Sequence, residues 1–195
     1  TLPLREIICG YGEILKHSLI MDKNFFTYLN NNGSKILTLK SPFLENAIFQ
    51  SCRIKKIIVE KDEKEKELRK ILNFGHTFAH SYEASLGYSK KLNHGEAVIL
   101  GMISALKFSL CNKLIKYKEY QSVINHIKKM NLPSNIRNYF SEKNLNRIIF
   151  FMTKDKKNFS KKINLILLRK IGLTIINNQY NNNEIKKFLK QELSN

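Results

Sequence analysis

The sequence predicts a mainly α-helical domain that carries a small two-stranded β element near residues 162–176. Apolar side chains recur at three- and four-residue spacing through most of the 195-residue chain, which is the period of helices that face a core. The period changes to two over residues 163–167, and Gly172 separates this segment from a second short apolar run. No βαβ alternation, internal repeat or domain-splitting linker occurs, so we expect residues 1–195 to form a single domain.

The first third of the chain predicts two or three helices. Residues 5–29 have the pattern of one or two helices, and the Asn-rich run 30–33, which ends in glycine, is typical of a turn. Ser41 followed by Pro42 is a common helix start, because serine caps the first turn and proline fits the first helical position. We expect this helix to extend to about Val59.

The middle of the chain predicts two long helices. The mixed-charge run 60–67 is typical of a solvated helix face, and a helix is expected from about residue 65 to residue 86. Gly87 is well placed to end it. A polar loop over residues 89–93 then leads into a strongly apolar helix over residues 94–112.

Shorter elements complete the chain. Helices are expected over residues 117–130 and 141–152, strands over residues 163–167 and 173–176, and a last helix over residues 183–193.

The net charge of +18, from 34 Lys and Arg against 16 Asp and Glu, is compatible with nucleic acid, an anionic membrane surface or small anionic substrates as partners. The same excess also arises from A/T-rich codon usage, since Lys, Asn and Ile are all abundant. Arginine-rich clusters with interleaved aromatic residues, which favour nucleic-acid contact, are absent from the sequence.

Neither a membrane span nor a disulfide framework is predicted. No run of about 18 uncharged apolar residues occurs. Cys9, Cys52 and Cys111 are odd in number and have no CxxC spacing, so we expect them to be small buried residues in a reducing cytosol. The chain starts without methionine or a signal-peptide pattern, and we expect it to be a fragment or a processed piece.

A polar stripe is the most informative feature of the sequence. Arg69, Asn73, His76 and His80 are spaced by four, three and four residues, so on the helix predicted there they share one face. Each such group buried without a partner costs about 1–3 kcal/mol. We therefore expect this face to line a functional site.

The histidines of this stripe suggest a metal site. His76 and His80 have the spacing of the two zincin histidines, but Thr77 stands where a zincin has glutamate, so a zincin is excluded. His94, at the start of the next predicted helix, can reach back across a helical hairpin, and Glu13 can supply a carboxylate. Two histidines and one carboxylate are a usual set for catalytic zinc, but spacing alone leaves open which two histidines bind.

The other two histidines, His17 and His126, have no such neighbours in sequence. We expect both to be surface residues or hydrogen-bonded structural ones.

The string LNFGHTFAHSYE is followed by GY and then by HGEAV, and this order resembles the signature of the 3-dehydroquinate synthase family. The resemblance extends over the whole chain in order. The matching segments are residues 2–6, 10–16, 72–83, 87–88, 94–98, 155–157 and 171–172.

The resemblance implies the helical C-terminal half of a cytoplasmic, zinc- or cobalt-dependent and NAD-dependent enzyme of the shikimate pathway. Such an enzyme is a carbon–oxygen lyase that converts 3-deoxy-arabino-heptulosonate 7-phosphate into 3-dehydroquinate with elimination of phosphate. The resemblance also implies that the enzyme is a homodimer. It further implies that the enzyme binds neither nucleic acid nor a membrane. The family's NAD-binding Rossmann-like domain is expected to be absent from this chain, so that the chain alone is inactive.

The resemblance also assigns residues. Glu13, His76 and His94 match the metal ligands of the family. The positions that match residues around the substrate are Lys16, Lys55, Glu65, Arg69, Asn73 and His80. One lysine of the pair Lys156 and Lys157, taken here as Lys156, matches a phosphate contact.

Two alternatives remain at this stage. One is a different sugar phosphate cyclase, such as a deoxy-inosose or valiolone synthase, with the same metal and NAD chemistry. The other is a basic helical module that binds nucleic acid, whose affinity would fall steeply with salt.

Overall fold

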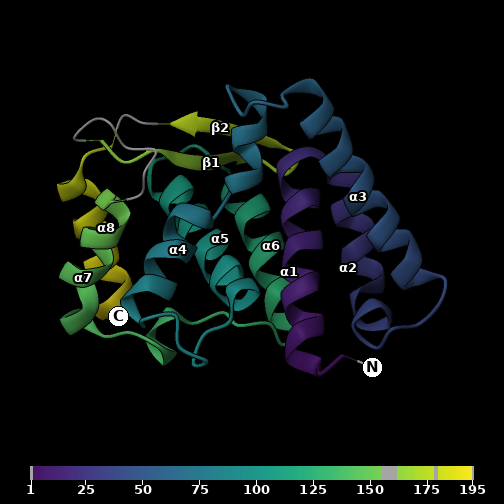
Figure 1. The fold of residues 1–195 in the computed structure, drawn as a ribbon, viewed down its shortest axis with the longest axis horizontal. Coiled ribbons are helices and arrows are strands. Elements are labelled where there is room, and N and C mark those ends of the chain that lie inside the picture. Colours follow the sequence, from purple (N-terminus) through teal and green to yellow (C-terminus); the bar gives the residue numbers. More distant parts are fainter. Residues whose placement is uncertain (1, 155–161, 178–179, 195) are drawn as a thin grey trace.

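The computed structural model of the chain describes residues 2–154, 162–177 and 180–194, and the predicted mainly helical fold is confirmed (Figure 1). The elements in chain order are α1 (Leu4–Met21), α2 (Lys23–Leu37), α3 (Phe43–Lys61), η1 (Leu68–Asn73), α4 (His76–Ser85), α5 (His94–Cys111), α6 (Tyr117–Lys129), η2 (Ile136–Asn138), η3 (Glu142–Asn144), α7 (Leu145–Lys154), β1 (Leu165–Lys170), β2 (Leu173–Asn177) and α8 (Asn182–Ser194). The helices α1, α2 and α3 lie side by side at one end, α7 and α8 lie at the other, and α4 and α5 lie between them.

Helix α5 is the centre of the core and packs against both α1 and α4. It is apolar around most of its circumference, which is typical of a helix that is buried on all sides. Its length and composition would suit a membrane span, but 78% of this 18-residue stretch is buried inside the protein. Within the described residues, α5 is therefore a core helix.

Glycines allow the backbones of these helices to approach closely. A Cβ at Gly95, in the first turn of α5, would overlap the backbone of Cys9 in α1. A Cβ at Gly101, two turns later, would overlap the carbonyl oxygen of Gly75, which lies directly before α4. Larger side chains at either position would push α1 or α4 away from α5.

The predicted β element is present as an antiparallel pair, in which Leu165 of β1 is opposite Asn177 of β2. Gly172, in the turn, has a φ of +85° and donates its N–H to the carbonyl of Leu19, which fixes the hairpin to α1. The period-two pattern predicts one buried face, but Ile166 and Leu168 are buried as well. Both faces of β1 are therefore covered.

The predicted turn at residues 30–33 is wrong, because α2 continues through it to Leu37. The chain breaks instead at Asp22, whose carboxylate caps α2 by accepting the N–H of Phe25. A Cβ at Gly33 would lie 2.5 Å from Sδ of Met130. This glycine therefore serves a close helix contact rather than a turn.

The predicted continuous helix over residues 65–86 is also wrong. Helix α3 ends at Lys61, and the Asp62 carboxylate then accepts three backbone N–H groups, at Lys66, Glu67 and Arg69. An aspartate that bonds nearby N–H groups in this way holds the backbone in a loop in place of a helix. The charged run 60–67 is therefore mainly a loop.

Two further features divide the segment that follows. The 3-10 helix η1 ends at Asn73, and Gly75 then adopts a φ of +81°, which starts α4 in a new direction at His76. A left-handed glycine of this kind interrupts a helix where the sequence period alone would continue it.

The cysteines differ from the prediction of burial. Cys52 and Cys111 are exposed and Cys9 is partly buried. Cys52 lies on the solvent side of α3, and Cys111 lies in the last turn of α5 where the helix leaves the core.

The two isolated histidines are hydrogen-bonded structural residues, one of the two outcomes expected from the sequence. Nδ1 of His17 lies 2.7 Å from Oγ of Ser51. The ring of His126 donates from Nδ1 to Oδ1 of Asn30 at 3.2 Å and accepts at Nε2 from the Tyr11 hydroxyl at 2.9 Å. Burial lowers the pKa of both histidines to about 4.

The lowered pKa of His126 predicts a loss of stability in mild acid. Between pH 6.5 and about 4 the unfolded chain binds a proton at this histidine and the folded chain does not, so the free energy of unfolding falls as the pH falls. The full effect is of the order of 3 kcal/mol. Urea unfolding over this pH range should show a shallower dependence for His126→Gln than for the wild type. Equal slopes in the two proteins would contradict the prediction.

The close approach at Gly101 predicts a second stability effect. Gly101→Ala should lower the free energy of unfolding by about 1–3 kcal/mol, because its Cβ meets backbone atoms that cannot move aside. Gly10→Ala is the matched control, since a Cβ there meets nothing within 4 Å. Urea unfolding should show that this helical substitution raises stability by about 0.5–1 kcal/mol. A change in the free energy of unfolding of the same sign in Gly101→Ala and Gly10→Ala would contradict the prediction.

Candidate metal centre

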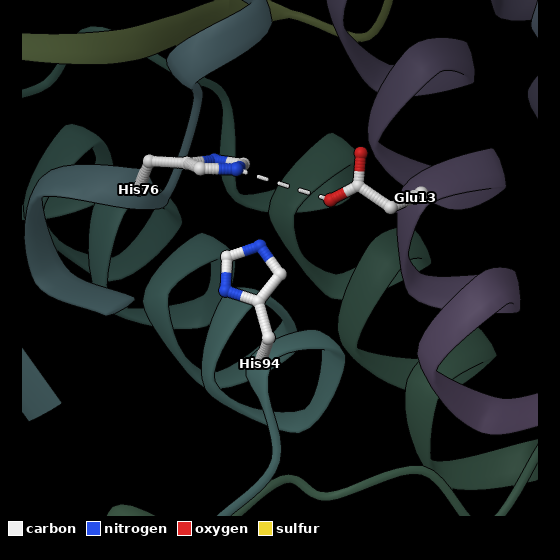
Figure 2. A group of neighbouring side chains, drawn as sticks. All are labelled: Glu13, His76 and His94. Carbon is white, nitrogen blue, oxygen red and sulfur yellow. Dashed lines mark ion pairs between the residues drawn. The ribbon is translucent and has the colours of Figure 1, made fainter. Parts of the chain in front are cut away.

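Three side chains from three helices point toward one another (Figure 2). Glu13 lies in the middle of α1, and His76 and His94 are the first residues of α4 and α5. One ligand atom from each lies within 4.8 Å of the other two, and Nε2 of His76 lies 3.9 Å from Oε1 of Glu13. This spacing suits a single cation between them.

The position of His94 is set by the loop before α5. The side chain of Asn93 and that of Glu96 form a capping box, which starts the helix at His94. Arg5 of α1 then donates to both carboxylate oxygens of Glu96, at 2.8 and 2.6 Å, and to the carbonyls of Lys90 and Lys91. This bidentate pair connects the loop that carries His94 to the helix that carries Glu13.

His76 is held as a neutral ring with a free nitrogen. Its Nδ1 donates to the carbonyl of Phe74 at 3.3 Å, so Nε2 keeps its lone pair on the side of Glu13. Burial, and then the positive charge of Lys16, lower the pKa of His76 to about 3. A metal at this position therefore meets an unprotonated ligand at neutral pH.

His94 is held by a carboxylate. Its Nδ1 lies 3.2 and 3.1 Å from the two carboxylate oxygens of Glu83 in α4. This hydrogen bond raises the pKa of His94, and burial opposes the rise in part. The other ring nitrogen points into the gap between His76 and Glu13 (Figure 2).

Glu13 has one oxygen with a partner and one without. Oε2 accepts from Nζ of Lys16 at 2.7 Å, whereas Oε1 is buried and has no hydrogen-bond partner among the described residues. Burial raises the pKa of Glu13, but the charge and hydrogen bond of Lys16 outweigh it, and the net pKa is below the usual value. An ionised oxygen without a donor, beside two free imidazole nitrogens, fits a divalent cation.

His80 lies next to this group and faces solvent. Its ring centroid lies 5.4 Å from that of His76 and 6.2 Å from that of His94. It borders a cavity of about 480 Å³ that is lined by Thr77, His80, Glu83, Ala84, Tyr88, His94, Phe151 and Lys154. The cavity could admit a small substrate beside the candidate metal ligands.

The other residues assigned through the resemblance are placed less uniformly. Lys16 is buried beside Glu13, and this burial lowers the pKa of Lys16. Lys55 is exposed on α3, and its charge makes a smaller contribution in the same direction. Nδ2 of Asn73 donates to Oε1 of Glu65 at 2.7 Å. Lys156 lies outside the described residues.

The helical stripe predicted from spacing is therefore wrong in its geometry. Arg69 and Asn73 belong to η1, whereas His76 and His80 belong to α4, and Gly75 changes the chain direction between the two pairs. Arg69 donates to the carbonyl of Glu63 at 2.6 Å.

Sequence reasoning missed Glu83, the hydrogen-bond partner of His94. The signal was present, because the spacing of four from His76 to His80 continues with a spacing of three to Glu83. All three lie on one face of α4. Arg5 and Glu96 were missed too, and no local pattern relates residues 91 positions apart.

This fold is shared with sugar phosphate cyclases. A 2-epi-5-epi-valiolone synthase from Streptomyces hygroscopicus, solved with NAD+ and Zn2+ bound, matches with a TM-score of 0.82 at 22% identity, over 98% of this chain and 52% of that chain. A 2-deoxy-scyllo-inosose synthase complexed with carbaglucose-6-phosphate, NAD+ and Co2+ matches with a TM-score of 0.79 at 25% identity. This match covers 97% of this chain and 53% of that chain.

The chain belongs to the 3-dehydroquinate synthase family, since residues 10–158 match the family model described as 3-dehydroquinate synthase C-terminal. The 3-dehydroquinate synthase of Pelagibacter ubique is 60% identical over 194 residues, which are 100% of this chain and 53% of the relative. The 3-dehydroquinate synthase of Thermodesulfovibrio yellowstonii is 38% identical over 98% of this chain and 52% of the relative. The chain thus spans about half the length of the curated relatives it matches.

The geometry predicts different effects of two neighbouring histidines on metal binding. His76→Ala should weaken Zn2+ binding by more than about tenfold, since it removes one of three ligands, whereas His80→Ala should leave the affinity nearly unchanged. Competition with a coloured chelator measures both. Equal losses in the two variants would show that the ligand set is a different one.

Proposed function

We propose that this chain is the metal- and substrate-binding half of a 3-dehydroquinate synthase. The reaction is the conversion of 3-deoxy-arabino-heptulosonate 7-phosphate into 3-dehydroquinate with elimination of phosphate, which makes the enzyme a carbon–oxygen lyase. The observation that carries the proposal is the convergence of Glu13, His76 and His94 beside an open cavity, in a chain 60% identical to a relative of that name.

Glu13, His76 and His94 would hold the metal, which is zinc or cobalt by analogy with the two structurally similar cyclases. When bound, such an ion supplies Lewis acidity toward a hydroxyl that is being oxidised. The lowered pKa of Glu13 and His76 supports the assignment, because both groups are unprotonated near pH 7.

Cationic side chains near the centre would bind the acidic groups of the substrate. Lys16 lies against Glu13, and Lys55 is close enough to Lys16 that its charge contributes to the lowered pKa of Lys16. We assign these lysines and Arg69 to the substrate's carboxylate and hydroxyl groups, with Asn73 and Glu65 as hydrogen-bonding partners. His80, in the cavity wall, is assigned with Lys156 to the phosphate.

NAD would be held mainly by the remainder of a longer protein. The described residues contain a two-stranded antiparallel sheet and no parallel α/β sheet of the kind that binds dinucleotides. The relatives are about twice the length of this chain. Dimer formation stays a prediction.

The proposed division of roles can be tested with a fusion of this chain to the N-terminal half of the Pelagibacter ubique relative. With Zn2+, NAD and the heptulosonate phosphate, the fusion should release phosphate, and the chain alone should not. His80→Ala in the fusion should lower kcat/KM by about 10–100-fold, as for loss of a hydrogen bond to a charged phosphate group, while metal content is retained.

The intact relative is the positive control for this assay. A fusion that folds and holds zinc but releases no phosphate would contradict the proposed reaction. NAD-dependent turnover by the chain alone would contradict the proposed division between the two halves.

A further inference from the structure

Among the groups around the candidate metal centre, Glu83 is one to which the family resemblance gives no role. It lies on α4, the helix that begins with His76, and it faces α5, the helix that begins with His94. Its side chain is only 12% exposed, and both of its oxygens lie within hydrogen-bond distance of Nδ1 of His94. A nearly buried carboxylate is thus committed to one imidazole.

The two histidines of the centre are oriented in different ways. The His76 side chain is 13% exposed, so packing and the carbonyl of Phe74 restrict its ring. The His94 side chain is 53% exposed and borders two cavities, of about 480 and 540 Å³. Packing alone does not hold such a ring, and its rotamer freedom must be limited by a specific bond.

From this contrast, we propose that Glu83 is the positioning residue of the metal centre, acting through His94. This inference rests on the proposed metal-binding function. The carboxylate accepts the Nδ1 proton of His94, which fixes the tautomer and directs the Nε2 lone pair toward Glu13 and His76. A carboxylate also makes the imidazole a stronger donor to a cation than a backbone carbonyl does.

The same bond joins the two helices that carry the histidines. Because Glu83 and His76 share α4, the contact from Glu83 to His94 fixes one imidazole relative to the other across the hairpin. Among the described residues, the group with metal-ligand spacing consists of Glu13, His76 and His94 and does not include Glu83. Its oxygens are engaged by Nδ1, which is the arrangement of a supporting group rather than a ligand.

The test measures Zn2+ affinity of the full chain by competition with a coloured chelator, in the wild type, Glu83→Ala and Glu83→Gln. We expect Glu83→Ala to bind Zn2+ about 10–100-fold more weakly, the range found when such supporting partners are removed. Glu83→Gln should recover part of this loss, because the amide oxygen still accepts the Nδ1 proton. Glu6→Gln is the matched control: Glu6 also lines the larger cavity but makes no bond to His94, so its affinity should equal that of the wild type.

Co2+ absorption gives a second readout that a merely structural role would not change. The visible bands of the Co2+ protein should shift in Glu83→Ala and return toward the wild-type position in Glu83→Gln. Thermal unfolding without metal shows whether each variant is folded, and Glu83→Gln, which keeps the shape of the side chain, carries the test if the alanine variant does not fold.

The outcomes separate this inference from the function on which it rests. A wild-type chain that binds neither Zn2+ nor Co2+ would remove the proposed metal centre itself. If the wild type binds, unchanged affinity and an unchanged Co2+ spectrum in Glu83→Ala and Glu83→Gln would overturn the positioning role. Loss of affinity in Glu83→Ala with no recovery in Glu83→Gln would identify Glu83 as a direct ligand and overturn it as well.

Discussion

The close approach of α1 and α4 to α5 is the constraint on which the rest of the structure depends. At Gly95 the backbone of α1 occupies the space of a side chain, and at Gly101 the carbonyl of Gly75 does so. These two contacts set the distances between the three helices. The ligand atoms of Glu13, His76 and His94 can lie within 4.8 Å of one another because the backbones that carry them are this close.

Polar interactions then refine what the packing allows. The ion pair of Arg5 and Glu96 connects the start of α5 to α1. The hydrogen bond from His94, the first residue of α5, to Glu83 connects the same end of α5 to α4. Both pairs are charge-assisted, and they act on a region where exposure would otherwise leave the backbone and the imidazole mobile. The geometry of the centre therefore depends on two kinds of contact, which are close helix packing and charged hydrogen bonds.

Much of this could be predicted from the sequence, and the failures have identifiable causes. Helical periodicity correctly located α6 and α8, because each has a clear apolar side, and α5 was located as a long, strongly apolar segment. It failed where one side chain or one glycine redirected the backbone. Periodicity predicted one helix over residues 65–86, but the Asp62 carboxylate and the positive φ of Gly75 interrupt it. Composition predicted a turn at residues 30–33, but α2 continues through this segment, where Gly33 serves a close helix contact.

The residues of the site show the same limit. Spacing could relate His76 to His80 and could have reached Glu83, since all three share one helix face. Residue types and spacing also suggested Glu13 and His94 as ligands but left open which two histidines bind, and the family resemblance selected His76 and His94. Contacts such as that of Arg5 with Glu96 depend on tertiary packing and are invisible to any local pattern.

The unpartnered oxygen of Glu13 has a consequence for folding. Without a cation, the folded chain keeps a buried, ionised oxygen that water would solvate in the unfolded chain, which is a cost to the native state. A cation shared by α1, α4 and α5 would remove this cost and, like a reversible cross-link, would also restrict the chain between the three helices. Metal supply would then set how stable the folded chain is.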